Sequence, residues 1–274
     1  MNWLQCLLYG FVSGAAEFLP ISAEAHRGLL RIMFGTEASP LLELVIHIAV
    51  LAALIIACWP QLARLQRERH LAAIPPKRRR RQPDLDTLKN FRLLKTAAAP
   101  MLIAFVFWFL TRKAASSLLI MAVLLTVNGI LLYTPAFVPQ GNKAAAKVSG
   151  LDGFLIGLGG ALGVIPGISR VSGITMVGIH RGCDRRYILD VALLLSVPAL
   201  VVLIVWDIIL LILAGAAVSG GLLLGCFLAL AAALPTAYLS IIFLRFLAVK
   251  VGFSGFAYYN WGAAMFAFIL YLTI

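Results

Sequence analysis

Long apolar segments alternate along the chain with short polar connections. Six segments approach the roughly 20 residues that a helix needs to cross a bilayer; they cover 41–59, 94–111, 117–136, 187–214, 220–245 and 254–273. Four others have about 15 residues, or roughly 22 Å as helices, which falls short of a hydrocarbon core of about 30 Å; they cover 3–17, 21–35, 151–165 and 169–182. The pattern predicts an all-α polytopic membrane protein with six spans and four half-length helices.

Two interruptions separate the half-length helices, and both contain a proline followed by a serine. The first surrounds Pro20 and Ser22, and the second surrounds Pro166 and Ser169. Because a proline lacks a backbone donor and clashes with the preceding turn, each interruption should end one helix and let another begin. We expect each pair to form a re-entrant hairpin whose non-helical tip is buried in protein or lines a wet cavity.

The predicted elements come twice in the same order. One hairpin and three spans make up residues 1–136, with the hairpin at 3–35, and the order returns in residues 151–274, with the hairpin at 151–182. Because three is an odd number of crossings, the second repeat must be inverted relative to the first. The first hairpin should then open outward and the second inward, with their tips meeting near the membrane midplane, where inverted repeats form binding sites.

The composition indicates that the protein lies in a membrane, and the distribution of charge indicates its orientation there. The sequence is 62% hydrophobic and 12% charged, whereas a soluble domain has about 25% charged residues, so an integral membrane protein is expected. Of the 23 Lys and Arg residues, 11 lie in the predicted loop 60–96, which the positive-inside rule places in the cytoplasm with both termini outside. Between two spans, this basic loop is expected to contact anionic lipids, and no nucleic-acid partner is expected.

Ionisable and hydroxyl side chains gather at the two interruptions. Charged groups are costly at membrane depth, so those near the tips are functional candidates; they are Glu17, Glu24, His26, Arg27 and Arg170. Ser22 and Ser169 stand where the second half-helices begin and are expected to act as N-caps. The free N–H groups and the positive dipole end of such a terminus attract anions, so the site suits a phosphate ligand.

Three of these residues have both a chemical and a structural interpretation. Arg170 could bind phosphate through two parallel hydrogen bonds, or it could simply pair with Glu17. His26 could transfer a proton or attack phosphorus, or it could be a buried histidine with satisfied hydrogen bonds. Glu17 could orient that histidine or hold a divalent cation that offsets phosphate charge.

Other charged residues nearby have less defined roles. Arg27 and Arg31 are expected to snorkel outward along their half-helix rather than act in chemistry. His47 lies in the following span, four residues after Glu43, and the sequence leaves open whether it faces the site or pairs with that glutamate.

The two interruptions resemble the motifs of the bacterial undecaprenyl-pyrophosphate phosphatase family of the bacitracin-resistance type. The first motif is matched by Glu17-Phe-Leu-Pro-Ile-Ser-Ala-Glu-Ala-His26, and the second by Pro166-Gly-Ile-Ser-Arg-Val-Ser-Gly-Ile-Thr175. Glu43 followed by His47 also looks like the family's acidic residue with a histidine or glutamine four residues later, and the resemblance covers essentially the whole chain.

The resemblance implies the fold, the reaction and the site of that family. Its members have six spans and two re-entrant hairpins in an inverted repeat. They remove the terminal phosphate of the C55 diphosphate lipid carrier at the outer face of the bacterial plasma membrane, aided by Mg²⁺ or Ca²⁺, and so recycle the carrier for cell-wall synthesis. For this chain the resemblance implies catalytic roles for Glu17, His26 and Arg170, a metal-binding role for Glu17, and substrate binding by Ser22, Gly167, Ser169 and Thr175.

Several positions depart from the family's motifs. Ser13 stands in place of an acidic or amide residue, Ala23 in place of a serine implicated in catalysis, and Asn260 in place of an arginine. Two hydroxyl residues of the second motif are replaced by Val171 and Ile174.

These departures weaken a serine-based mechanism and leave one centred on His26. Glu24 is new beside the first motif, and it could bind substrate in place of a lost carboxylate. We expect a membrane phosphatase acting on polyprenyl diphosphates. The alternatives are a carrier or flippase that binds the same headgroup without hydrolysing it, and a paralog with a degenerate site. A homodimer is left open.

Overall fold

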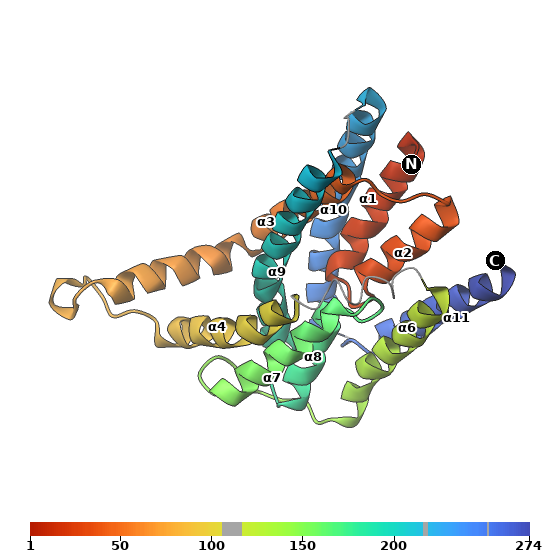
Figure 1. Cartoon of the computed structure of the whole chain (residues 1–274). Helices are drawn as coiled ribbons and strands as arrows, with labels where there is room; N and C mark the ends of the chain where they lie inside the picture. Colours follow the sequence, from red (N-terminus) through yellow and green to blue (C-terminus); the bar gives the residue numbers. More distant parts are fainter. Residues whose placement is uncertain (106–116, 216–218, 251) are drawn as a thin grey trace.

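Helices account for most of the chain that the structure describes. The computed structural model describes residues 1–105, 117–215, 219–250 and 252–274. In chain order the α-helices are α1 (Trp3–Phe18), α2 (Ala23–Phe34), α3 (Pro40–Ala73), α4 (Leu85–Phe105), α6 (Leu118–Tyr133), α7 (Gly150–Ala161), α8 (Arg170–His180), α9 (Arg185–Ala214), α10 (Gly220–Lys250) and α11 (Gly255–Thr273). Short 3₁₀ helices lie between some of them, at Pro76–Arg78, Thr134–Phe137 and Leu162–Val164. Within these residues the fold is all-helical, as predicted (Figure 1).

Four of these helices are long and apolar enough to cross a membrane. They are Pro40–Ala73, Leu118–Phe137, Arg185–Ala214 and Gly220–Ala248. They coincide with four of the predicted spans, which identifies an integral membrane protein. The predicted span 254–273 forms α11, and the predicted span 94–111 begins in α4 but ends outside the described residues.

The half-length helices and their interruptions are confirmed. Helix α1 ends at Phe18 and α2 begins at Ala23, so the stretch around Pro20 is not helical. Between α7 and α8, the chain passes through one 3₁₀ turn and the stretch around Pro166 before a new helix begins. Within each pair the two helices pack against each other.

The basic segment 60–96 is a helical arm and not the predicted loop. Helix α3 continues through Pro60 to Ala73, and α4 begins at Leu85. Residues 61–73 are rich in Leu, Ala, Arg, Gln and Glu, which are strong helix formers, so the helix extends beyond its apolar part. A proline inside an established helix can kink it without ending it.

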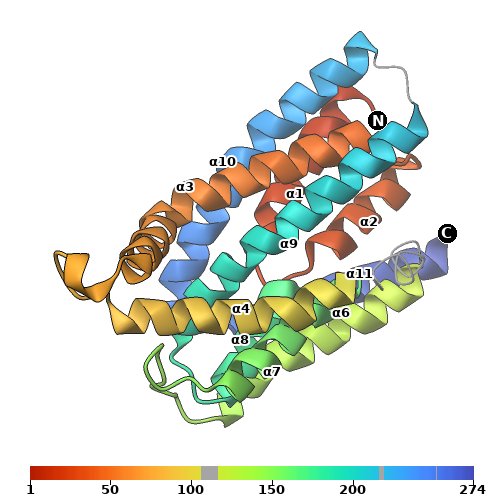
Figure 2. The same cartoon turned by 60° about the vertical axis from the view of Figure 1, so that its left-hand side comes forward.

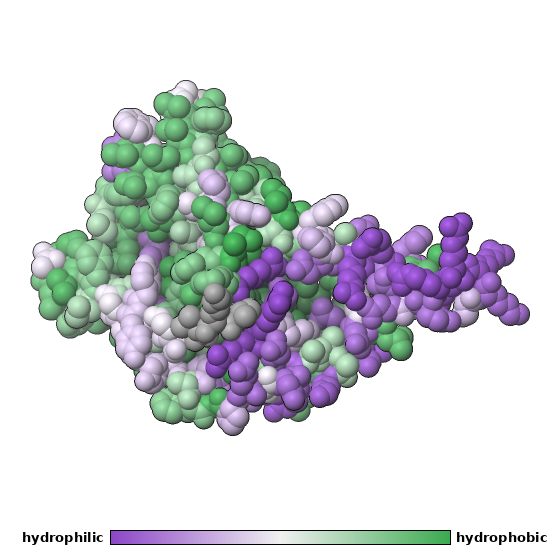
Figure 3. Space-filling view, turned by 180° about the vertical axis from the view of Figure 1, so that it is seen from behind, coloured by the Kyte–Doolittle hydropathy of each residue, from purple (hydrophilic) through white to green (hydrophobic). Residues whose placement is uncertain are grey.

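This arm projects from the bundle as a polar extension. Figure 1 shows α3 running away from the other helices and α4 returning toward them. From behind, hydrophilic residues cover the arm while hydrophobic residues cover most of the bundle (Figure 3). Residues 74–84 connect α3 to α4. Ion pairs of Arg81 with Glu68 and of Asp84 with Arg64 attach this segment to the end of α3.

Small residues let the first helix pair sit close against a long helix. Gly10 and Gly14 of α1 face Ala229 and Ala233 of α10, and a methyl group at either glycine would overlap the α10 backbone. Four-residue spacing of small residues is the common way for membrane helices to approach closely. This contact fixes the position of α1, and with it the position of the break that follows.

Candidate functional site

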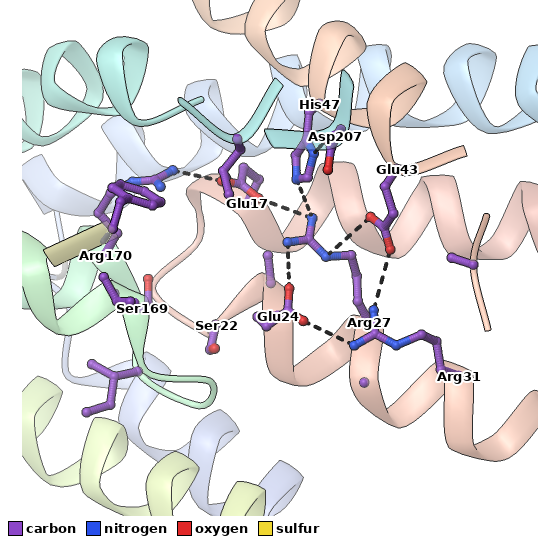
Figure 4. Close-up of a pocket in the computed structure, with 18 of the residues that line it drawn as sticks. Glu17, Ser22, Glu24, Arg27, Arg31, Glu43, His47, Ser169, Arg170 and Asp207 are labelled. Atoms are coloured by element: carbon purple, nitrogen blue, oxygen red, sulfur yellow. Dashed lines mark hydrogen bonds and ion pairs between the residues drawn. The ribbon is translucent and has the colours of Figure 1, made fainter. Parts of the chain in front are cut away.

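A polar pocket lies inside the apolar bundle where the two helix breaks meet. It has a volume of about 290 Å³ and is lined chiefly by α1, α2, α3, α9 and the start of α8. Ten of its polar lining residues are labelled in Figure 4: Glu17, Ser22, Glu24, Arg27, Arg31, Glu43, His47, Ser169, Arg170 and Asp207. Glu37 also lines it. So many ionisable groups gathered inside an apolar bundle indicate a functional site.

Hydrogen bonds join the two breaks directly. The backbone N–H of Gly167 donates to Ser22 Oγ at 3.0 Å, and Ser169 Oγ donates to the Leu19 carbonyl at 3.4 Å. Ser22 has φ 64°, a left-handed conformation that few residues other than glycine adopt, and its side chain makes no cap bond. The predicted N-cap role of Ser22 is therefore wrong, because its hydroxyl holds the opposite break instead. Ser169 does cap α8, accepting from the N–H of Ser172.

Three side chains hold the first break in place through hydrogen bonds to the carbonyl oxygen of Pro20. It accepts hydrogen bonds from Asn128 Nδ2 at 3.1 Å, Asn260 Nδ2 at 3.2 Å and Ser172 Oγ at 3.2 Å. Asn128 also donates to Asn260 Oδ1 at 2.8 Å, so α6 and α11 are linked at this point. Asn260, which departs from the family's arginine, thus holds the break and lies outside the pocket lining.

Glu17 and Arg170 bring the two breaks together through an ion pair. Arg170 Nη2 donates to Glu17 Oε1 at 2.8 Å, and its Nε donates to Ser196 Oγ at 3.3 Å. Both charged side chains are buried, with 5% of Glu17 and 10% of Arg170 exposed. The expected neighbourhood of these two residues is confirmed, and both line the pocket.

Arg27 and Arg31 point into the pocket, contrary to the predicted outward snorkelling. Arg27 contacts Glu17 Oε2 at 3.7 Å and Glu24 Oε2 at 3.0 Å, and its side chain is 6% exposed. Arg31 contacts Glu24 Oε1 at 3.1 Å and Glu43 Oε1 at 3.4 Å. Because residues three, four and seven apart share one face of a helix, α2 presents all three of its pocket charges together.

A histidine and an aspartate from different long helices complete the pocket. His47 Nδ1 of α3 lies 2.6 Å from Asp207 Oδ2 of α9, and both side chains are buried. His47 therefore faces the site, which is one of the two placements that the sequence left open. Asp207 was missed, although a carboxylate in the middle of the apolar segment 187–214 is the kind of signal that marks a functional residue.

Three predicted site residues do not line this pocket. His26 Nδ1 lies 2.9 Å from the Ser22 carbonyl oxygen and its Nε2 lies 2.8 Å from the Tyr259 hydroxyl, beside a separate apolar pocket of about 520 Å³. Gly167 meets Ser22 through its backbone, and the Thr175 hydroxyl bonds back to the Val171 carbonyl of its own helix. The structure thus places His26 at a different pocket from the one that Glu17 and Arg170 line.

The pocket combines three guanidinium groups with five carboxylates and the imidazole of His47. Arg27, Arg31 and Arg170 supply planar guanidinium groups, which bind phosphate through paired hydrogen bonds better than any other side chain. Carboxylates hold these groups in place, and His47 can accept a proton. Ala23 also lines the pocket, so the position that departs from the family's serine does face this site.

Comparison with known proteins matches nearly the whole chain. The family described as Bacitracin resistance protein BacA matches residues 6–266. The undecaprenyl-diphosphatase of Carboxydothermus hydrogenoformans is 28% identical over 263 residues, which cover 95% of this chain and 94% of that protein. The undecaprenyl-diphosphatase of Moorella thermoacetica is 31% identical over 204 residues, which cover 72% of this chain and 73% of that protein. That of Treponema denticola is 29% identical over 211 residues, with 76% of each chain covered.

Proposed function

The chain belongs to the family of the bacitracin resistance protein BacA, and we propose that it hydrolyses the terminal phosphate of undecaprenyl diphosphate or a related polyprenyl diphosphate. The relatives named undecaprenyl-diphosphatase support this reaction. The observation that carries it is the buried pair of Glu17 and Arg170 at the meeting point of the two breaks, with Arg27 on the other carboxylate oxygen.

In this proposal the arginines hold the diphosphate. Arg170 has five N–H donors, and its described hydrogen bonds engage Nε with Ser196 and Nη2 with Glu17. Donors therefore remain for phosphate oxygens, and the start of α8 behind Ser169 adds its positive dipole end. Charge that moves onto the leaving lipid phosphate would be stabilised by these groups, which are already in position before the reaction.

Contacts between the two halves support an inverted repeat with re-entrant hairpins. Helix α1 packs on α10, and α7 packs on α4, so each half-length pair lies against the second long helix of the other half. The first long helices, α3 and α9, pack on each other, and so do the third, α6 and α11 (Figure 2). A two-fold axis that exchanges residues 1–136 with 151–274 would produce this pattern.

Labelling of single cysteines tests this orientation. With the four native cysteines replaced, a cysteine at Arg80 on the arm should react with an impermeant maleimide only from the cytoplasmic side of inner-membrane vesicles. A cysteine at Asn2 should react only from outside. Reaction of both positions from the same side would contradict the proposed topology and the outward-opening site.

A divalent cation, Mg²⁺ or Ca²⁺, is part of the proposal. Among the described residues no three His, Cys, Asp or Glu side chains are spaced to hold a metal by themselves. Magnesium is, however, often held by one or two carboxylates together with substrate phosphates. Glu17 would take that role once the diphosphate draws Arg170 and Arg27 away from its two carboxylate oxygens, and the cation would offset phosphate charge.

Phosphate release from the purified protein tests the function. In detergent, the full chain should release inorganic phosphate from undecaprenyl diphosphate when Mg²⁺ or Ca²⁺ is present. A chelator should lower the rate by at least about tenfold, because the cation offsets charge on the phosphates, and added cation should restore it. Protein that binds the lipid diphosphate but releases no phosphate with any of these ions would contradict the proposal and favour a carrier.

We also propose that the basic arm contacts the membrane surface. Its exposed arginines would lie beside the cytoplasmic leaflet, where each basic residue near anionic lipids contributes about 1 kcal/mol to binding. The arm would thus help to fix the orientation in the bacterial plasma membrane.

A further inference from the structure

His47 and Asp207 form a buried dyad at the wall of the phosphate pocket. The 2.6 Å contact between His47 Nδ1 and Asp207 Oδ2 joins α3 to α9, and both side chains are at most 7% exposed. Figure 4 shows the imidazole reaching from α3 toward Arg27, between Glu17 and Glu43. The contact therefore places an ionisable ring beside the groups that hold the phosphate.

The neighbours of His47 determine which ring nitrogen carries the proton. Arg27 Nη1 lies 3.2 Å from His47 Nε2. A guanidinium can only donate hydrogen bonds, so Nε2 must be the accepting, unprotonated nitrogen. The proton then sits on Nδ1 and is donated to Asp207. The lone pair of the ring consequently points at the arginine that also contacts Glu17.

We propose that His47 is the general base of the reaction and that Asp207 positions it, an inference that rests on the proposed phosphatase function. A base whose second nitrogen is held by a carboxylate is the arrangement that enzymes use to activate a nucleophile. Ala23 offers no hydroxyl to act as that nucleophile, so water takes this part. His26 lines another pocket and is absent from the lining of this one.

The step balances in atoms and charge. The water oxygen forms a bond to the terminal phosphorus while its proton passes to His47 Nε2. The bond between that phosphorus and the bridging oxygen breaks, and the electron pair stays on the lipid monophosphate, held by the arginines. When the phosphate draws Arg27 away from Nε2, it frees the lone pair that takes the proton. Inorganic phosphate leaves, and His47 returns the proton to water.

A purely structural role is the alternative to be tested. A buried His–Asp pair between two long helices could simply satisfy two polar groups in an apolar bundle. The two roles differ in what glutamine would do at position 47. Its amide can donate to Asp207 and accept from Arg27, which would preserve a structural link, but it cannot take up a proton.

Kinetics of glutamine variants at two histidines separate these roles. With undecaprenyl diphosphate and the purified full chain, His47→Gln should lower kcat by about 10²-fold or more, the usual contribution of a general base, with KM changed little. His180→Gln is the matched control, because His180 is an exposed residue at the end of α8 outside the pocket. It should retain the wild-type kcat.

Chemical rescue and a variant of Asp207 supply independent readouts. His47→Gly should be inactive, and added imidazole should raise the rate of this variant at least about tenfold. Asp207→Asn should lower kcat strongly and change KM only a little, because the amide no longer fixes the Nδ1–H tautomer of His47. Asp207→Glu should recover part of the lost kcat.

Two outcomes would overturn the inference while leaving the proposed function intact. The first is His47→Gln with a kcat within twofold of an active wild-type protein. The second is a His47→Gly protein that imidazole does not rescue. A wild-type protein that releases no phosphate would instead contradict the proposed function itself.

Discussion

Replacing Arg170 with alanine should lower phosphate release from undecaprenyl diphosphate by about 10³-fold, because it removes a preorganised cation beside the leaving group. The side chain is buried and already aligned by Glu17 and Ser196, so it need not be ordered by the substrate. Loss of such a group should reduce kcat and also weaken binding, and both are measured from the dependence of the rate on substrate concentration.

A lysine at the same position refines this test. Arg170→Lys keeps the charge but loses the planar fork, so its activity should recover only part of the loss. Arg186→Ala, which removes an exposed arginine at the start of α9, is the matched control and should retain wild-type activity. An Arg170→Ala protein with a rate within tenfold of wild type would show that the pair with Glu17 is only a structural bridge.

The breaks and the pair that joins them could be predicted from the sequence because proline has a local effect. Pro20 and Pro166 lie in the non-helical stretches and remove a backbone donor there, although a proline alone does not end a helix, since α3 continues through Pro60. The apolar pieces beside them are too short to span a bilayer, which suggested paired half-helices. Glu17 and Arg170 flank these breaks. Because the tips of two inverted hairpins were expected to meet, the two residues were expected to lie close together.

The direction of the side chains on α2 is where the sequence interpretation failed. Counting His26 among the charged groups of the site took no account of its direction on α2, which begins at Ala23, after Ser22 with φ 64°. At 100° per residue, His26 lies about 200° from Glu24, whereas Arg27 and Arg31 lie on the same face as Glu24. A helical wheel drawn from Ala23 would have placed His26 opposite the charged face.

Asp207 and the arm show two other limits of the sequence. Asp207 is 160 residues away from His47, so no local pattern links them, and only the packing of α3 on α9 brings them together. The end of α3 was misjudged because hydropathy reports where the membrane ends and not where the helix ends. Helix-forming residues after Pro60 allow α3 to continue into water.

Replacing Arg27 with methionine should destabilise the protein strongly. Arg27 is buried among three carboxylates, with contacts to Glu17 at 3.7 Å, to Glu24 at 3.0 Å and to Glu43 at 4.0 Å. Removing one partner of a buried ion pair leaves uncompensated charge and typically costs about 3–5 kcal/mol of the free energy of unfolding. Unfolding of the protein in mixed detergent micelles, followed by circular dichroism, would measure this loss.

Two further variants show whether unpaired charge is the cause. Arg31→Met should cost less, because that side chain is 17% exposed and one of its partners, Glu37, is 86% exposed. Adding Glu24→Gln to Arg27→Met should restore part of the stability, since it removes one of the carboxylates that lost its cation. If Arg27→Met unfolds at the same detergent fraction as the wild-type protein, then Arg27 snorkels to the surface as its position in the sequence suggested. The carboxylates of the pocket would in that case have to be neutralised by protons, and the site would bind phosphate with Arg170 as its principal cation.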